Sequence, residues 1–213
     1  MEKIKAVIFD WDGTLFDSVK HALNVYRKLF TLLGINGVRW NEFREEFKAD
    51  YHKYYLEKGI PKSAFKDVDR LWLQLYNDGS KKLKLIHGAK AILKKLKKEN
   101  IKLGVVSNGS RSRIIEEMKS HKVFDLFDVV VTGDEIPEFK PSPKGIIYAL
   151  HVLNVKPSEA IYIGDMAEDI EAGKNAEVKT IAVASGIHTV KRLVKEQPDY
   201  IMQDVRGLMQ VIF

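Results

Sequence analysis

The stretch Ala6-Val7-Ile8-Phe9-Asp10-Trp11-Asp12-Gly13-Thr14 decides the fold, because it leads from an apolar strand directly into an acidic turn. The apolar residues predict a buried β-strand, and the glycine predicts the turn that ends it. Side chains alternate along a strand, so Asp10 and Asp12 are expected on the same face. One carboxylate can then attack or bind a metal while the other transfers protons. Gly13 and Thr14 can surround an anion such as phosphate, although Asp and Gly are also ordinary turn residues.

Downstream of this stretch, apolar runs alternate with amphipathic helical patterns. Strands are predicted at residues 4–9, 101–106, 128–132, 160–163, 180–184 and 200–202, and helices at residues 89–99, 112–121, 144–153 and 167–176. The strands are almost continuously apolar, which is typical of a parallel sheet with helices on both faces. The sequence therefore predicts a doubly wound α/β fold.

The segment after the first strand interrupts this alternation. It predicts helices only, at residues 18–33, 41–57 and 64–78. We therefore predict an α/β core formed by residues 1–16 and 83–213 and a helical cap formed by residues 17–82, placed to act as a lid.

The cap contains two groups of residues that bear on the substrate. Its aromatic residues are expected to pack in the interior rather than to contact a substrate: Tyr51, Tyr54, Tyr55 and Trp72. Candidate substrate contacts, with simple exposure as the competing interpretation, are His21, Arg27, Lys48 and His52.

Composition excludes several classes of protein. The 213 residues are 45% hydrophobic, enough for one large domain or two small ones. The absence of cysteine excludes disulfides, thiolate zinc sites and cysteine nucleophiles. No stretch resembles a signal peptide or a membrane span, so a cytoplasmic protein without membrane contact is expected.

The net charge of +6 is the remaining compositional signal. The lysines lie at helical spacing, as in Lys94-Lys95-Leu96-Lys97-Lys98, which indicates solvated helix faces. No aromatic residues interleave with them to stack on bases, so no nucleic-acid partner is expected. The charge favours attraction of small phosphorylated anions. It does not predict an oligomeric state.

Polar residues collect where the later strands end. Ser107-Asn108-Gly109 follows the strand at 101–106, Lys140 lies in the loop after 128–132, and Asp165 and Asp169 follow 160–163. Ligands of open parallel sheets bind at the carboxyl ends of the strands. Each residue alone also suits a turn, a cap or an exposed surface. Arg111, just after the serine, could lean toward the same site.

These residues resemble the four signatures of the haloacid dehalogenase superfamily, in its phosphoglycolate-phosphatase-like branch. The first signature is similar to residues 9–18, the second to Val106-Ser107-Asn108-Gly109, the third to Lys140-Pro141 and the fourth to residues 163–170. The resemblance spans nearly the whole chain, and the helical segment takes the position of the family's first type of cap.

The resemblance implies a phosphatase mechanism. Asp10 is the expected nucleophile, which forms an aspartyl-phosphate, and Asp12 the general acid and base. Mg²⁺ is the expected cofactor, bound by Asp10, Asp165 and the backbone carbonyl of Asp12. The remaining expected roles are phosphate binding by Ser107 and Asn108, positive charge from Lys140, and orientation of Lys140 or a metal-bound water by Asp169.

Several alternatives stay open. Asp12 disfavours dehalogenation but is compatible with a phosphohexose mutase. A phosphoaspartate receiver domain and an inactive binding module of the same fold are further candidates. The substrate is a small phosphorylated metabolite, with phosphoglycolate, sugar phosphates, nucleotides and pyrophosphate all open. The family pattern is broken at Met166, where a polar residue is common, and at Glu177, where a glycine is usual, which puts a left-handed turn there in doubt.

Overall fold

The computed structural model describes residues 3–136 and 138–212, so residues 1, 2, 137 and 213 of the predicted core lie outside the described residues. Among the described residues, the strands are β1 (Ala6–Phe9), β2 (Lys102–Val106), β3 (Val129–Val131), β4 (Ala160–Gly164), β5 (Lys179–Val183) and β6 (Tyr200–Met202). They form one parallel sheet in the order β3-β2-β1-β4-β5-β6. The chain reverses direction across the sheet between β1 and β4, where ligands bind in such folds.

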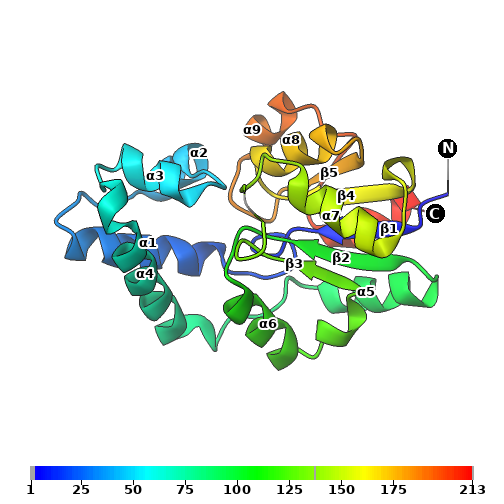
Figure 1. Ribbon diagram of the computed structural model, residues 1–213, viewed down its shortest axis with the longest axis horizontal. Helices are drawn as coiled ribbons and strands as arrows, with labels where there is room; N and C mark the ends of the chain where they lie inside the picture. Colours follow the sequence, from blue (N-terminus) through cyan, green and yellow to red (C-terminus); the bar gives the residue numbers. More distant parts are fainter. Residues whose placement is uncertain (1–2, 137, 213) are drawn as a thin grey trace.

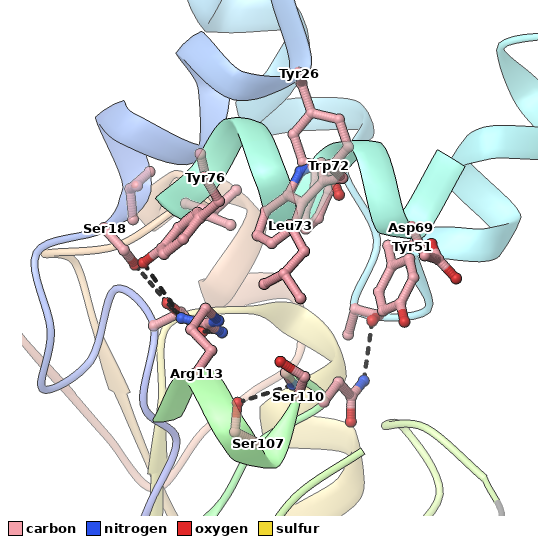
Figure 2. Close-up of a pocket in the computed structure, with 18 of the residues that line it drawn as sticks. Ser18, Tyr26, Tyr51, Asp69, Trp72, Leu73, Tyr76, Ser107, Ser110 and Arg113 are labelled. Carbon is pink, nitrogen blue, oxygen red and sulfur yellow. Dashed lines mark hydrogen bonds and ion pairs between the residues drawn. The ribbon is translucent and has the colours of Figure 1, made fainter. Parts of the chain in front are cut away.

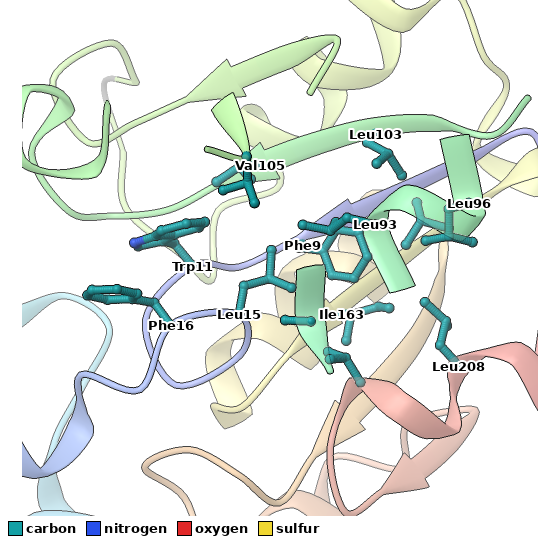
Figure 3. Packing of buried hydrophobic residues seen from close by; sticks show 14 of the residues in the cluster. Phe9, Trp11, Leu15, Phe16, Leu93, Leu96, Leu103, Val105, Ile163 and Leu208 are labelled. Atoms are coloured by element: carbon teal, nitrogen blue, oxygen red, sulfur yellow. The ribbon is translucent and has the colours of Figure 1, made fainter. Parts of the chain in front are cut away.

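Helices cover both faces of this sheet (Figure 1). On one face, α5 (Ala89–Lys98) and α6 (Arg111–Ser120) pack on Val7 and Phe9 of β1. On the other face, α7 (Lys144–Leu153) and α8 (Ala167–Asn175) pack on Ala6 and Ile8. Figure 3 shows the first of these clusters around Phe9. Because every strand of the sheet interior is buried on both faces, the predicted doubly wound α/β fold is confirmed.

Shorter elements complete the core. They are the helices α9 (Val190–Lys195) and α10 (Met209–Ile212) and the 3₁₀ turns Phe124–Leu126, Pro157–Glu159 and Val205–Leu208. Among the described residues, no helix combines the length and the apolar character that a membrane crossing requires.

Between β1 and α5 the chain forms a helical insert that lies beside the carboxyl ends of the strands (Figure 1). It consists of α1 (Val19–Leu32), α2 (Trp40–Glu46), α3 (Tyr51–Glu57), the 3₁₀ turn Lys62–Ala64 and α4 (Phe65–Ser80). Its interior is aromatic, with Tyr26 in ring contact with Phe43, Tyr54 and Trp72. This aromatic cluster lies mainly in the insert, and Met166 and Ile187 of the core also contribute to it.

The single helix predicted at 41–57 is wrong, because α2 and α3 are separate. Phe47 is extended, with ψ of 141°, and ends α2. The carbonyls freed by this break bind the core: Phe47 O lies 3.1 Å from Nε2 of His188, and Ala49 O accepts from the Asn108 side chain at 2.9 Å. Tertiary contacts thus offset the helical hydrogen bonds that are lost.

The doubt about the turn at Glu177 is also wrong. Glu177 adopts φ of +59° without being glycine. A hydrogen bond from Val178 N to Gly173 O at 3.1 Å closes the turn. Helix α8 thus ends with a residue in the left-handed conformation, as many helices do. The conformation costs a non-glycine residue about 1–2 kcal/mol, which the packed ends of α8 and β5 offset.

Candidate active site

An acidic cluster, defined as Asp10, Asp165 and Asp169, lies where the sheet order reverses. Asp10 follows β1 and Asp165 follows β4, and these strands pair directly in the sheet. Asp169 lies in the first turn of α8. One carboxylate oxygen from each lies within 4.8 Å of the other two, and all three residues are buried. The strand ends thus bring these predicted residues together.

Lys140 enters the acidic cluster from the loop after β3. Its Nζ donates to Asp10 Oδ1 at 2.6 Å, to Asp169 Oδ1 at 2.5 Å and to the Tyr162 hydroxyl at 3.1 Å. Burial opposes the charge of Lys140, but Asp10 and Asp169 hold its pKa well above the usual value. Lys140 is therefore a fixed cation, only 4% exposed.

The carboxylates outnumber this one lysine. Burial raises the pKa of Asp10 to about 7 despite Lys140. Burial, and then the charges of Asp10 and Asp169, raise the pKa of Asp165 well above its usual value. A divalent cation at this position would offset the excess negative charge, and carboxylate oxygens are the ligands that Mg²⁺ prefers. The donor set fits such an ion.

The turn after β1 encloses Asp165. Thr14 donates its hydroxyl to Asp165 Oδ1 at 3.1 Å, and Ile187 N donates to Oδ2 at 2.7 Å. Gly13 has φ of +79°, and a Cβ atom there would lie 2.6 Å from Asp165 Oδ2. Only glycine fits at position 13, because the backbone is in the left-handed region and Asp165 leaves no space for a Cβ atom.

Asp12 points to a different set of partners. Its carboxylate accepts from Arg113 Nη2 at 2.5 Å, from Arg113 Nη1 at 3.0 Å and from the Ser18 hydroxyl at 2.7 Å (Figure 2). Burial opposes ionisation, but the Arg113 guanidinium holds the pKa of Asp12 below its usual value. Ser18 stands at the start of α1, yet its hydroxyl serves Asp12 rather than capping the helix.

Arg113 is the site residue that the sequence analysis missed. Its Nη1 lies 3.1 Å from Glu117 Oε2, and Glu117 accepts from Trp11 Nε1 at 2.7 Å and from the Tyr76 hydroxyl at 2.9 Å. Arg111, which was considered instead, is exposed and pairs with Glu135 at 2.7 Å. The available signal was the spacing of Arg113 and Glu117, four residues apart on the same face as buried Ile114 and Met118.

Ser107 and Asn108 stand at the end of β2. Ser107 is buried, and its hydroxyl accepts from Gly109 N at 3.3 Å. Asn108 donates to Ala49 O of the helical insert and accepts from Lys140 N at 3.2 Å. Asn108 therefore ties the end of β2 to both the insert and the lysine.

A cavity of about 490 Å³ lies between the strand ends and the helical insert (Figure 2). Asp10, Asp12, Ser107, Asn108 and Lys140 line its lower part. Insert residues line its upper part: Tyr26, Phe43, Phe47, Tyr51, Tyr55, Trp72, Leu73 and Tyr76.

The cap residues singled out in the sequence fall into two groups. Tyr51, Tyr55 and Trp72 pack in the aromatic cluster of the insert, as expected, and they also line the cavity. The candidate cap contacts bind elsewhere: His21 to Tyr76 O, Arg27 to Val38 O, Lys48 to Glu57 and His52 to Asp69. The insert therefore lines the cavity mainly with aromatic side chains, together with Asp69 and Arg70.

The family model for haloacid dehalogenase-like hydrolases matches residues 7–183, which include both the strand-end residues and the insert. The chain belongs to this family. This confirms the resemblance carried by the strand-end signatures, and it makes the protein an enzyme of the haloacid dehalogenase-like hydrolase family.

Relatives within this family carry phosphatase names. Pyrophosphatase PpaX of Listeria monocytogenes is 31% identical over 230 aligned positions, covering 99% of this chain and 97% of the relative. Pyrophosphatase PpaX of Bacillus mycoides is 28% identical with the same coverage. Among solved structures, a hydrolase from Pseudomonas syringae has a TM-score of 0.87 at 22% identity, covering 98% of this chain and 97% of that one. CbbY from Rhodobacter sphaeroides in complex with phosphate has a TM-score of 0.80 at 22% identity, covering 96% of each chain. Both solved structures have the same fold as this chain.

Proposed function

We propose that this phosphatase of the haloacid dehalogenase-like family is a Mg²⁺-dependent phosphomonoesterase that acts through an aspartyl-phosphate on Asp10. The observation that carries the proposal is the juxtaposition of Asp10, Lys140, Asp165 and Asp169 at one end of the cavity between the strand ends and the insert. A small phosphorylated metabolite is the proposed substrate. The predicted cytoplasmic location stays a prediction.

Asp10 is suited to attack phosphorus. Among the described residues, only its Oδ1 accepts a side-chain hydrogen bond, from Lys140, so Oδ2 is available to a substrate. Attack by Oδ2 forms the oxygen–phosphorus bond as the bond to the leaving oxygen breaks. Lys140 keeps Asp10 oriented and stabilises negative charge on the transferred group, while Asp169 positions Lys140. Ser107 and the amide of Asn108 are placed at the cavity wall to bind the phosphoryl oxygens.

Asp12 is the proposed proton donor and acceptor. It gives a proton to the leaving oxygen and then takes one from the water that attacks the acyl phosphate, which releases phosphate and restores Asp10. In the present arrangement Arg113 and Ser18 occupy its carboxylate. Because Ser18 starts α1 of the insert, movement of the insert would release one of these bonds.

The acidic cluster is the proposed metal site. Asp10 and Asp165, with the backbone carbonyl of Asp12, would hold Mg²⁺, consistent with the raised pKa of both carboxyls. When bound, the ion supplies positive charge that offsets repulsion between the carboxylates and the phosphoryl oxygens.

Pyrophosphate hydrolysis is the second candidate, because PpaX relatives at 31% identity are named pyrophosphatases. The same residues would serve, with phosphate in place of an alcohol as the leaving group. A phosphohexose mutase would isomerise a sugar phosphate without releasing phosphate, so phosphate release separates it from both.

The test is phosphate release from p-nitrophenyl phosphate, with Mg²⁺ and with EDTA, in the parent, Asp10→Asn and Asp17→Asn. Asp17 is exposed and does not line the cavity, so Asp17→Asn is a matched control on the same loop. We expect turnover in the parent and the control with Mg²⁺, and its loss with EDTA and in Asp10→Asn. Turnover by Asp10→Asn at the parent rate would contradict the nucleophile, and full activity in EDTA would contradict the metal.

A further inference from the structure

The upper part of the cavity, called here the cap chamber, is the part lined by the insert residues Tyr26, Phe43, Phe47, Tyr51, Tyr55, Trp72, Leu73 and Tyr76. We propose that the cap chamber receives an apolar, ring-bearing leaving group, so that the substrate is the phosphomonoester of such an alcohol and not inorganic pyrophosphate. The proposal rests on the proposed phosphatase function and names its substrate class.

The size of the cavity is the first argument. At about 490 Å³ it falls within the range of sites that hold ligands the size of drugs or cofactors, roughly 300–1,000 Å³. The phosphoryl group occupies only the end next to Asp10 and Lys140. A second phosphoryl group in the chamber would leave most of its apolar wall uncovered, whereas a ring-bearing group would cover it.

The charges around the cavity are the second argument. Arg113 is 7% exposed and already lies between the carboxylates of Asp12 and Glu117. Lys140 is held in the same way by the acidic cluster. The proposed Mg²⁺ lies at the acidic cluster, where the transferred phosphoryl group binds, and not in the cap chamber. A leaving group with its own negative charges in the chamber would therefore have to displace a carboxylate from Arg113 or Lys140, or lose its hydration without a counter-charge.

The remaining charged residues of the cavity wall add no further positive charge that faces the cavity without a carboxylate partner. Arg70 is the other cation among the described lining residues, and its guanidinium points to Asp67 at 3.3 Å on the surface of α4. Asp69 and Asp134 also line the cavity and add negative charge. The wall as a whole thus disfavours a compact polyanion such as pyrophosphate or phosphoglycolate.

The arrangement of rings is the third argument. Trp72 stacks on Tyr76 with 4.9 Å between centroids and 22° between planes, and Tyr26 lies 5.9 Å from Trp72. Figure 2 shows Leu73 reaching from α4 into the space above Ser110 and Arg113. Flat aromatic walls of this kind bind planar or apolar groups by stacking and by exclusion of water. The Ser110 hydroxyl, buried without a partner among the described residues, offers one hydrogen bond to such a group.

The experiment compares three substrates in one preparation: 3-phenylpropyl phosphate, ethyl phosphate and inorganic pyrophosphate. The two esters release primary alcohols of similar acidity, so their ratio of kcat/KM reports binding of the ring rather than leaving-group chemistry. We expect kcat/KM for the phenylpropyl ester to exceed that for the ethyl ester by at least about tenfold, and pyrophosphate to be the poorer substrate.

Two charge variants localise the effect. Leu73→Lys places a cation in the chamber, whereas Gln74→Lys places one on the exposed side of the same helix, outside the cavity. We expect Leu73→Lys to shift the phenylpropyl-to-pyrophosphate ratio toward pyrophosphate by at least about tenfold, and Gln74→Lys to leave it unchanged. Because each ratio is measured within one preparation, partial unfolding of a variant cancels. Leu73→Ala provides a second variant, expected to lower the ratio of kcat/KM for the phenylpropyl ester to that for the ethyl ester.

Preference of the parent for pyrophosphate, or equal ratios in Leu73→Lys and Gln74→Lys, would overturn the substrate class while leaving Asp10-dependent hydrolysis intact. Failure to release phosphate from all three substrates would instead overturn the proposed function, and the inference with it.

Discussion

At the acidic cluster, the Lys140 Nζ lies within 2.6 Å of a carboxylate oxygen of both Asp10 and Asp169. In the cap chamber, by contrast, aromatic rings pack against one another, with 5.9 Å between the ring centroids of Tyr26 and Trp72. The first region is held by a few directional charge contacts, and the second by broad apolar contact. The difference teaches that the two ends of one cavity suit separate tasks. In the proposed function, the cluster breaks the phosphoester bond and the chamber selects the molecule that is held there.

The largest expected effect is at the proposed nucleophile. Asp10→Asn should lower kcat by at least about 10³-fold with every substrate, because the group that forms the covalent bond is lost. A chamber variant such as Leu73→Ala should change the ratio between substrates and keep kcat for ethyl phosphate. Initial rates for both variants test this separation, and an Asp10→Asn effect that differs strongly between substrates would break it.

A substitution in the acidic cluster and one in the cap chamber should lower the free energy of unfolding with different pH dependence. Lys140→Met leaves buried carboxylates without their cation and should cost about 3–5 kcal/mol near pH 8. Because burial raises the pKa of Asp10 to about 7, protonation neutralises this carboxyl as the pH falls toward 5, and the cost should shrink. Phe43→Ala in the chamber should cost a similar ~3–5 kcal/mol by leaving a cavity, at every pH. Urea unfolding of both variants at pH 8 and pH 5 measures these costs. An equal change with pH in Lys140→Met and Phe43→Ala would contradict the view that charge contacts hold the acidic cluster and apolar packing holds the chamber.

His188 joins the two regions and should make stability depend on pH. It is fully buried, its Nδ1 accepts from Ala167 N at 2.8 Å, and its Nε2 faces Phe47 O of the insert. Burial, and then Arg192, lower the pKa of His188 to about 4. The unfolded chain therefore binds a proton near pH 6.5 that the folded chain binds only near pH 4, so stability falls as the pH drops through this interval, by about 3 kcal/mol in total.

The measurement is urea unfolding of the parent and His188→Asn at pH 7.5, 6, 5 and 4. The asparagine keeps an acceptor for Ala167 N but does not titrate, so the variant should lack this part of the pH dependence. Equal slopes for parent and variant would contradict the shifted histidine.

The smallest expected effect concerns a hydroxyl that links the regions. The Tyr76 hydroxyl donates to Glu117 at 2.9 Å, so Tyr76→Phe should cost about 1 kcal/mol. Tyr54→Phe is the matched control, because the Tyr54 hydroxyl is buried with no hydrogen-bond partner in the described part of the chain. Its removal should be neutral or slightly stabilising. Thermal unfolding of both variants checks this order, and the reverse order would contradict it.

Much of the core and of the acidic cluster could be predicted from local patterns. The helix expected at residues 144–153 coincides with α7, and each predicted strand lies within two residues of an observed one. Parallel strands end at one edge, so polar residues that follow strands meet there whatever the details of packing. This is why Asp10, Lys140, Asp165 and Asp169 could be grouped by their order along the chain.

The insert and Arg113 could not be predicted in the same way. The break at Phe47 depends on core donors that come much later in the chain, such as His188 and Asn108. Arg111 and Arg113 flank Ser112 and are chemically alike, and only the facing carboxylate of Asp12 distinguishes them. The aromatic character of Tyr51 and Trp72 predicted packing in the interior without showing that a cavity lies on that side.

The amino-acid sequence by itself determined the doubly wound sheet, the inserted helices and the residues that gather at the strand ends, because strand alternation and helical periodicity are local properties. Only the tertiary structure decided that Asp12 is held by Arg113 and that the insert presents aromatic rings to the cavity. Both outcomes depend on which faces of distant elements oppose each other, and no local pattern encodes that pairing.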